Sequence, residues 1–340
     1  MPQFPKQSVP SPVSPLTDPF SRRISYLRLA VTDRCNLRCR YCMPDSRVKF
    51  FSAKELLRWD ELRLLVRIFV ALGVEKIRVT GGEPFVRPGL LPFLEWLRSS
   101  FPQVGVYLTT NGTLAADFIP RLKEMGIGGI NLSLDTLRPE RFRALTGRRL
   151  LARVMNTFET ALEYGLPLKV NAVIQDGWNT DEIVPLARLA AKNPVEVRFI
   201  EEMPFGAMRS FQNPRWRAGR ILEVLRHHFP GMQAVKKAKG TTAQLYTVPG
   251  FRGRLGIIAG YSRAFCHGCN RLRLTADGKL RTCLYARPEV NLREELRRSV
   301  SEEEIAGRIR AAVFRKPADG RGPASVEKTG HSERMAAIGG

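Results

Sequence analysis

The stretch YLRLAVTDRCNLRCRYCM, residues 26–43, joins an apolar run to a loop that holds three cysteines. The apolar run predicts a strand over 26–31. Cys35, Cys39 and Cys42 follow it in the pattern Cys-x3-Cys-x2-Cys. Thiolates this close together can bind three irons of a four-iron, four-sulfur (4Fe-4S) cluster and leave the fourth iron without a protein ligand. An open metal position is where a cofactor or substrate binds and reacts.

Zinc binding and simple packing are the alternatives for this first trio. Structural zinc normally takes four ligands, usually as two pairs, and only three cysteines lie close together here. Buried cysteines also pack as small apolar side chains, but three within eight residues would be unusual. The spacing therefore favours an iron–sulfur cluster. S-adenosylmethionine could chelate the open iron through its amino and carboxylate groups, and electron transfer would then yield a 5′-deoxyadenosyl radical.

Outward from this stretch, short apolar or β-branched runs alternate with segments of helical period as far as residue 203. Strands are expected at 26–31, 76–80, 105–109, 129–134, 167–174 and 195–200. Helical segments are expected at 53–72, 90–100, 118–125, 151–164 and 181–191. Six such units predict a parallel sheet covered by helices.

Polar motifs directly follow four of the expected strands, at 80–83, 109–112, 133–135 and 201–203. In a (β/α) barrel all strands end at one mouth, so these loops would converge. Convergence from several strands suits a barrel better than the single crevice of a doubly wound sheet. The sequence therefore predicts an α/β fold, an incomplete (β/α)6 TIM-type barrel with a smaller C-terminal domain.

The alternation stops after about residue 204, and a second cysteine trio follows. We expect a disordered tail at 1–24, the barrel at 25–230, and a C-terminal domain at 231–340 that ends in a mobile Gly- and Ala-rich tail from Arg315. Strand-like runs lie at 243–248, 254–258 and 272–275. The Asp277-Gly278 pair predicts a hairpin turn between 272–275 and 279–284.

Cys266, Cys269 and Cys283 form the second trio, in the pattern Cys-x2-Cys-x13-Cys. His267 is poorly placed to complete a zinc site with both neighbouring cysteines. Zinc and a second open-sited iron–sulfur cluster both remain open on spacing alone. Arg271 and Arg273 alternate on the strand that follows, so both guanidinium groups face one side, where they suit bidentate capture of phosphate.

Composition limits the class of protein. The chain has 340 residues and a net charge of +23, from 55 Lys and Arg against 32 Asp and Glu. The cations are spread along the whole chain, which predicts a mostly solvated basic surface. All six cysteines belong to the two trios, so a disulfide framework is not expected. No apolar run of about 18 residues occurs, and we expect a cytoplasmic protein without a membrane span.

The motif Gly81-Gly82-Glu83-Pro84 follows the second expected strand. Together with the first trio, and with an aromatic residue before its last cysteine, this motif resembles the radical S-adenosylmethionine superfamily. The resemblance implies that the Gly-Gly-Glu stretch holds the amino group of S-adenosylmethionine. It also implies that Tyr41 contacts the adenine of the cofactor, and that Ser133 and Met203 line the same pocket.

The whole chain beyond the N-terminal tail resembles one family in that superfamily, the GTP 3′,8-cyclases that begin molybdenum cofactor biosynthesis. The resemblance rests on residues 27–29 before the first trio, on the second trio with its Arg-Leu-Arg, and on Gly339-Gly340. It implies that the second 4Fe-4S cluster binds the guanine of GTP, and that the Gly-Gly tail reaches the active site with Arg271 and Arg273. The expected GTP-binding residues are Arg28, Arg78, Thr109, Lys169, Arg271 and Arg273.

The reaction implied is a radical cyclisation of GTP to (8S)-3′,8-cyclo-7,8-dihydroguanosine 5′-triphosphate. Implied partners are an electron donor such as flavodoxin, the downstream cyclic pyranopterin monophosphate synthase, and a second copy of the chain in a homodimer. One departure from the family is visible, because Asp319-Gly320 stands where a His often follows Lys316-Pro317. One alternative is another radical enzyme with an auxiliary cluster, such as a peptide maturase. The other is a zinc-stabilised nucleic-acid-binding protein, but that interpretation gives the Gly-Gly-Glu-Pro loop no function.

Overall fold

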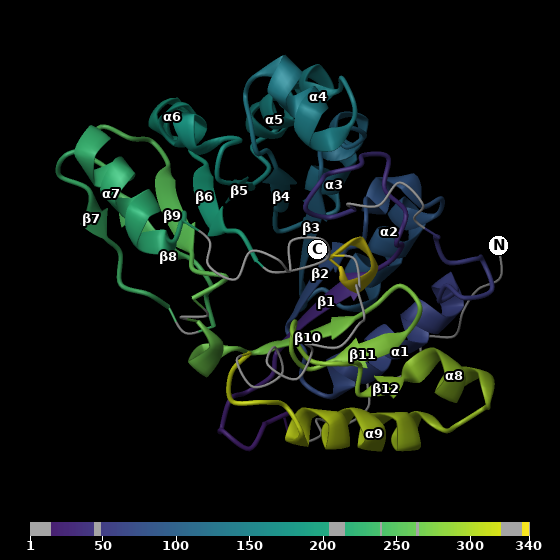
Figure 1. Ribbon diagram of the computed structural model, residues 1–340. Coiled ribbons are helices and arrows are strands. Elements are labelled where there is room, and N and C mark those ends of the chain that lie inside the picture. Colours follow the sequence, from purple (N-terminus) through teal and green to yellow (C-terminus); the bar gives the residue numbers. More distant parts are fainter. Residues whose placement is uncertain are drawn as a thin grey trace.

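One twelve-stranded sheet organises the fold, in the order β12-β11-β10-β1-β2-β3-β4-β5-β6-β9-β8-β7. The computed structural model describes residues 15–43, 49–203, 215–238, 240–262, 265–320 and 335–339. The sheet curves, and helices cover its outer face (Figure 1). Its two edge strands do not pair with each other in this described part of the chain, so the barrel is open, as expected.

The middle of the sheet is the six-unit parallel barrel that the sequence predicts, since each strand from β1 to β6 pairs in parallel with the next. Its strands are β1 (Tyr26–Ala30), β2 (Lys76–Thr80), β3 (Gly105–Thr110), β4 (Ile130–Ser133), β5 (Leu168–Ile174) and β6 (Glu196–Glu201). Its helices are α1 (Trp59–Ala71), α2 (Leu90–Ser100), α3 (Ile119–Glu124), α4 (Pro139–Thr146), α5 (Leu151–Glu163) and α6 (Ile183–Lys192).

Side chains alternate between the two faces of each strand. On β1 and β2 the apolar members Leu27, Leu29, Ile77 and Val79 are fully buried in the core between sheet and helices. Strands β3, β5 and β6 show the same alternation of buried and half-buried positions. The other set faces the barrel interior, where most of its members are polar. The alternation therefore gives the barrel a polar lining.

The C-terminal part of the chain extends this sheet at both edges. Strand β10 (Arg271–Leu274) pairs in parallel with β1, and β9 (Arg254–Ile258) pairs in parallel with β6. The expected hairpin is present, because β10 and β11 (Lys279–Arg281) are antiparallel neighbours. The remaining elements are α7 (Ala218–His228), β7 (Gln233–Ala234), β8 (Gln244–Thr247), β12 (Val290–Asn291), α8 (Leu292–Arg297), α9 (Glu302–Phe314) and α11 (Met335–Ile338).

Two segments expected to be tails are instead packed where the structure describes them. Residues 15–24, assigned to the disordered tail 1–24, bury Leu16 and Ile24 in the core and form a bridge from Thr17 to Arg23. Lys316 and Ile338, in the region expected to be mobile from Arg315 on, are 3% and 2% exposed. These expectations were wrong for those residues, because contacts with parts of the chain far away in sequence bury them. Residues 1–14 and 321–334 lie outside the described residues.

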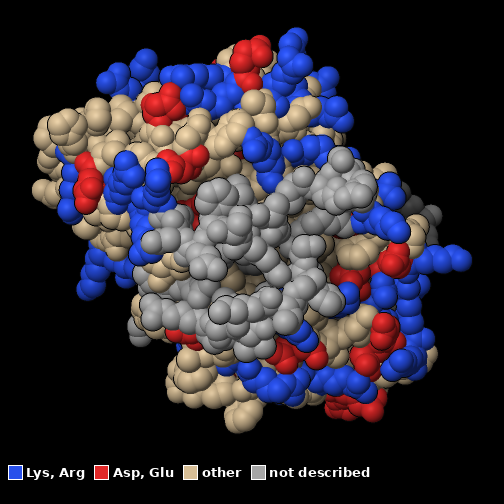
Figure 2. All heavy atoms as spheres, viewed as in Figure 1, with Lys and Arg blue, Asp and Glu red and all other residues tan. Residues whose placement is uncertain are grey.

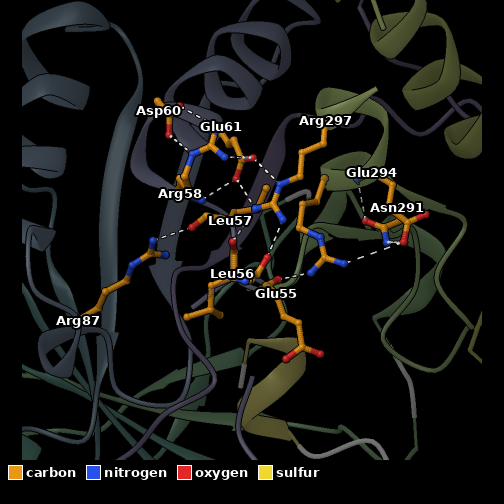
Figure 3. Close-up of polar contacts among 12 residues, drawn as sticks. Glu55, Leu56, Leu57, Arg58, Asp60, Glu61, Arg87, Asn291, Glu294 and Arg297 are labelled. Atoms are coloured by element: carbon orange, nitrogen blue, oxygen red, sulfur yellow. Dashed lines mark hydrogen bonds and ion pairs between the residues drawn. The ribbon is translucent and has the colours of Figure 1, made fainter. Parts of the chain in front are cut away.

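Helix α1 begins at Trp59, later than the 53–72 expected from periodicity. Residues 54–57 form only a turn, in which the backbone N–H groups of Glu55 and Leu56 donate to the Ser52 carbonyl. Their own carbonyls do not continue a helix into α1, because they accept hydrogen bonds from arginines of other elements (Figure 3). Arg297 of α8 donates to the carbonyls of Lys54 and Leu56 at 2.6 and 3.1 Å, and to the Glu61 carboxylate at 2.7 and 3.1 Å. Tertiary contacts therefore override the local helical pattern. Helix α4, with Pro139 at its first turn, was missed.

No helix in the described ranges is long and apolar enough to cross a membrane.

Candidate functional site

The first trio lies in the loop after β1, packed against the end of α4. The backbone N–H of Arg38 donates to the Thr146 carbonyl at 2.8 Å, which fixes the loop. Two N–H groups face the Cys35 sulfur, those of Leu37 at 3.4 Å and Asn111 Nδ2 at 3.5 Å. Burial, then the neighbouring Cys42, raises the pKa of Cys39 well above its usual value, with Asp135 and Cys35 adding to the effect. The three sulfurs are therefore close enough to repel one another when ionised.

Tyr41 points from this loop to the end of β4. Its hydroxyl donates to Asp135 Oδ2 at 3.0 Å, and the Val173 N–H donates to Asp135 Oδ1 at 2.8 Å. Burial raises the pKa of Asp135 to about 6 and that of Tyr41 well above its usual value. The contact ties the first trio to strands β4 and β5, so the residue expected to touch adenine lies at the barrel mouth.

The Gly-Gly-Glu loop after β2 lies directly on the backbone that leads to Cys35. A Cβ on Gly82 would stand 2.3 Å from the Arg34 carbonyl oxygen, so only glycine fits there. The Glu83 carboxylate is fully buried and accepts hydrogen bonds from Thr110 Oγ1 at 2.8 Å and the Asn111 N–H at 2.7 Å. Burial raises the pKa of Glu83 to about 7. Glu83 therefore also joins the loops after β2 and β3.

Ser133 and Met203 lie at the ends of β4 and β6, as expected. Ser133 is paired in the sheet with Asn171. Met203 packs so closely on Gly260 that a Cβ there would meet its sulfur at 3.0 Å. Tyr285 fixes Gly260 by donating to its carbonyl at 3.0 Å. All described residues expected to bind S-adenosylmethionine thus lie at the carboxyl ends of the strands.

Cations fill the barrel interior in adjacent rows. Arg28 on β1 lies between Arg273 on β10 and Arg78 on β2. One step toward the amino ends of the strands, Tyr26 lies in the same way between Arg271 and Lys76. Like charges in a low-dielectric interior repel one another, so this arrangement favours a bound ligand with several negative charges.

The pKa shifts express this crowding of cations. Burial, followed by the neighbouring Arg78 and Arg271, lowers the pKa of Arg28 to about 10, although Tyr26 opposes the shift. Burial likewise lowers the pKa of Arg273 well below its usual range. Burial alone would raise the pKa of Tyr26, but the surrounding cations, led by Arg78, lower it to about 8. Tyr26 accepts a hydrogen bond from Arg78 Nε at 2.8 Å.

Strands β3 to β5 add uncharged polar atoms and one more cation to this lining. Asn131 lies between Thr109 and Lys169 in the register of the sheet. Thr109 Oγ1, Asn131 Oδ1 and Asn171 Oδ1 are buried without a hydrogen-bond partner in the described residues. Buried polar atoms normally have partners, so these three indicate where a ligand binds. Lys169 pairs with Glu196 at 3.2 Å.

The end of the chain enters the same interior (Figure 1). The Gly339 carbonyl accepts a hydrogen bond from Arg273 Nη1 at 3.2 Å. A Cβ on Gly339 would lie 3.1 Å from Thr80 Cγ2 and 3.2 Å from Ala30 Cβ, and its φ of 80° favours glycine. The tail therefore lies against β1 and β2 beside the cation rows. Gly340 lies outside the described residues.

The second trio lies at the opposite end of the barrel from the first. Cys269 is two residues before Arg271, whose partner in the parallel register is Tyr26 at the start of β1, whereas Cys35 follows the end of β1. Cys266 is in a short 3-10 turn, and Cys283 follows β11. The four paired residues of β1 and β10 span about 10–13 Å at about 3.3 Å per residue. The cation rows lie between the trios.

The residues of both trios fit iron–sulfur ligation. The three thiols of the second trio interact electrostatically, as those of the first trio do. In the described part of the chain no three His, Cys, Asp or Glu side chains converge on a single ion. A cubane cluster takes each thiolate on a different iron, so its ligands need not converge on one point. The N–H donors facing Cys35 are of the kind that tunes such clusters.

Surface charge is dispersed on the face shown in Figure 2. Lys and Arg side chains lie around the rim of that face with Asp and Glu among them, and they do not gather into one patch. The dispersal agrees with the expectation of a solvated basic surface.

Several residues of this interior were not anticipated from the sequence. Tyr26 and Lys76 stand two positions before Arg28 and Arg78, so strand alternation already placed them on the same face. Asn131 on β4 and Asn171 on β5 could have been predicted from the same strand alternation. Arg22 and Lys316, near the second trio, carried none, because distant elements bring them there.

Comparisons with known proteins agree with this geometry. The model of the Radical SAM superfamily matches residues 29–190, and that of Molybdenum Cofactor Synthesis C matches residues 195–321. A GTP 3′,8-cyclase of Heliobacterium modesticaldum is 42% identical, over 89% of this chain and 93% of that protein. The mitochondrial GTP 3′,8-cyclase of Arabidopsis thaliana is 41% identical, over 97% and 85%.

Longer relatives match as well. Molybdenum cofactor biosynthesis protein 1 of Bos taurus is 42% identical over 88% of this chain, which spans about half (48%) of that protein. Among solved structures, Streptococcus suis SuiB bound to its precursor peptide has a TM-score of 0.65 at 12% identity, over 94% of this chain and 77% of that one. The likeness to SuiB supports the fold alone.

Proposed function

Because the chain belongs to the family of GTP 3′,8-cyclases, we propose that it cyclises GTP to (8S)-3′,8-cyclo-7,8-dihydroguanosine 5′-triphosphate, at the first step of molybdenum cofactor biosynthesis. The observation that carries the proposal is the pair of cation rows between the two cysteine trios. A triphosphate would offset the mutual repulsion of Arg28, Arg78 and Arg273, which lie side by side in the interior.

The first trio would hold a 4Fe-4S cluster through Cys35, Cys39 and Cys42. With S-adenosylmethionine on its open iron, such a cluster supplies a 5′-deoxyadenosyl radical when reduced. The chain would position the cofactor by placing Gly81, Gly82 and Glu83 at its amino group. Three residues at the barrel mouth would contact the rest of the cofactor: Tyr41, Ser133 and Met203.

GTP would lie between the trios, with its guanine on the second cluster held by Cys266, Cys269 and Cys283. Thr109 and Lys169 join the arginines at the nucleotide. Removal of the hydrogen at C3′ of the ribose lets the resulting carbon radical bond to C8 of guanine. The nitrogen radical formed next needs one electron and one proton, and Arg271, Arg273 or the Gly339-Gly340 tail would assist there.

Partners and location belong to the same proposal. An electron donor such as flavodoxin would reduce the clusters, and cyclic pyranopterin monophosphate synthase would take the product. A homodimer, a cytoplasmic location and the domain division at residue 230 are further parts of it. Fractionation of cells that produce the tagged chain tests the location. Recovery in the cytoplasmic fraction would support the proposal, whereas recovery in mitochondria, the location in the name of the Arabidopsis thaliana relative, would contradict it.

The proposal is tested with protein purified and reconstituted without oxygen. About eight irons per chain are expected, four for each trio. Dithionite and S-adenosylmethionine should then release 5′-deoxyadenosine at a rate that GTP raises. In the Cys266→Ala variant about four irons should remain, and GTP should no longer be cyclised. Deoxyadenosine release that is indifferent to GTP would contradict the cyclase assignment while leaving the radical chemistry intact.

A further inference from the structure

A strap of residues 316–320 crosses the second trio and joins all three of its cysteine segments. Lys316 begins the strap directly after α9 and is 3% exposed. Its Nζ donates to the Arg271 carbonyl at 3.0 Å and to the Thr282 carbonyl. These carbonyls lie two residues after Cys269 and one before Cys283, so a single ammonium group links the two ligand segments.

Arg22, from the N-terminal segment 15–24, fixes the strap to the third segment. Its Nη1 donates to the carbonyls of Cys266 at 2.9 Å and Ala318 at 2.7 Å, and its Nη2 donates to Pro317 at 2.6 Å. The guanidinium is itself held by Asp18, whose Oδ2 lies 2.5 Å from Nε in a buried ion pair. At the end of the strap, the backbone of Gly320 forms a hydrogen bond with the Cys266 thiol.

Charge explains why an ammonium group is buried at this position. Burying a lone lysine is unfavourable, and an apolar side chain of the same length would avoid that cost. Burial lowers the pKa of Lys316, and Arg22 adds to this shift, whereas Cys269, then Cys283, and more weakly Asp18 favour the charged ammonium. The main electrostatic partners of Lys316 are therefore two sulfurs that would bind the cluster.

We infer that Lys316 and Arg22 are positioning residues of the second cluster: Arg22 retains it by fixing the strap, and Lys316 raises its reduction potential by placing a buried positive charge beside two of its sulfurs. Reduction adds negative charge to a cluster, so a nearby cation stabilises the reduced form. The inference rests on the proposed function for the identity of the cluster, whereas metal retention can be measured without it.

The charge of Lys316 is tested by Lys316→Met, which keeps the length of the side chain and removes the ammonium. The variant is made in the full chain with Cys35, Cys39 and Cys42 replaced by alanine, so that the signal comes from the second cluster alone. In a redox titration followed by electron paramagnetic resonance, the reduced-to-oxidised ratio at a fixed potential should fall about tenfold, equal to about 59 mV for one electron. Lys192→Met, on the exposed end of α6, is the control for lost charge and should leave the ratio unchanged.

The hydrogen bonds of Arg22 are tested by Arg22→Lys in the chain with both trios. Lysine keeps the charge beside Asp18 but cannot reach three carbonyls at once. Iron should fall toward the level of Cys266→Ala, with the first cluster retained, while any second cluster that remains keeps the wild-type potential. When Lys316→Met is made in the chain with both trios, selective loss of the second cluster would also support the inference.

Two results would overturn the inference. One is a Lys316→Met protein that holds its cluster at the wild-type potential, together with an Arg22→Lys protein that keeps about eight irons. The other is equal loss of both clusters in either variant, since the strap would then serve folding in general. Failure of the proposed function would look different: wild-type protein would release deoxyadenosine without regard to GTP, or hold zinc at the second trio, whatever the variants do.

Discussion

Arg28 shows how one residue can point to a ligand. It stands between Arg78 and Arg273, and its pKa is lowered to about 10 mainly because it is buried. No protein gains stability from placing three guanidinium groups side by side in its interior, so the cost must be offset by an anion. Phosphate oxygens accept the paired N–H groups of arginine, which makes a triphosphate the ligand that this row fits.

Glu83 gives a pH-dependent prediction at the same scale. Burial raises its pKa from 4.5 to about 7, so the folded protein binds a proton that the unfolded chain has lost. The stability from this proton is fully present below pH 4.5 and is lost as the pH rises through about 7. The Gln of Glu83→Gln cannot ionise, so this pH dependence is absent from the variant. The free energy of unfolding by which the variant is less stable than the wild type should therefore shrink by up to about 3 kcal/mol from about pH 5 to about pH 8, because the wild type loses stability over that range.

Chemical denaturation of the metal-free protein at both pH values measures this difference. Glu61→Gln is the matched control. Although burial opposes it, the hydrogen bonds from Arg297 and the Arg58 backbone lower the pKa of Glu61, so its contribution is lost only as the pH falls below 4.5. The deficit of that variant should stay constant over the window. A constant deficit for Glu83→Gln as well would show that Glu83 is already ionised when buried.

Site residues differ in how far the sequence could predict them. Cys35, Cys39 and Cys42 are local in sequence, so their spacing was enough. Arg28 and Arg78 were expected only from the resemblance to the cyclases, although both stand on one face of consecutive strands, where alternation could have placed them. Arg22 could not be found in this way, because it reaches Cys266 across 244 residues. Long-range contacts of this kind leave no periodic signal.

At the scale of elements, α8 holds the segment that precedes α1 (Figure 3). Arg297 is 33% exposed and pairs with Glu61, which is 5% exposed. Arg297→Ala would remove two hydrogen bonds from a buried carboxylate, which among the described residues would keep only those from Arg58, and would leave the carbonyls of Lys54 and Leu56 without the donor from Arg297. The variant should lower the free energy of unfolding by about 2–3 kcal/mol. Urea denaturation of the metal-free protein measures the change.

Arg121→Ala is the matched control for Arg297→Ala. Arg121 likewise donates to carboxylates, in three hydrogen bonds to Glu95 and Glu124, but on the surface, where its side chain is 56% exposed. Exposed ion pairs contribute little, so the loss of stability should be much smaller than that of Arg297→Ala. Equal losses in the two variants would mean that α8 does not fix the segment at 54–57.

Element prediction succeeded where the pattern was local. All six barrel strands were expected within one residue at each end, because alternation of apolar and polar residues is set by the strand itself. The joining of β9 and β10 to the two sides of the barrel was not expected. That pairing links residues far apart in the chain, and nothing in either strand alone specifies its partner.

At the scale of the whole molecule, the sheet order explains how two clusters can serve one reaction. Because β10 lies parallel to β1, Cys269 comes to the start of β1 while Cys35 follows its end. The nucleotide would then lie between a radical source at one end and a binding cluster at the other, with Gly339 beside it. The central claim is therefore about one hydrogen atom, that at C3′ of the ribose.

Transfer of that hydrogen atom can be measured directly. The reconstituted protein is incubated with dithionite, S-adenosylmethionine and GTP deuterated at C3′, and the 5′-deoxyadenosine released is analysed by mass spectrometry. The account predicts one deuterium in the deoxyadenosine, with none when the label is at another ribose carbon. Unlabelled deoxyadenosine from the C3′-labelled GTP would contradict it.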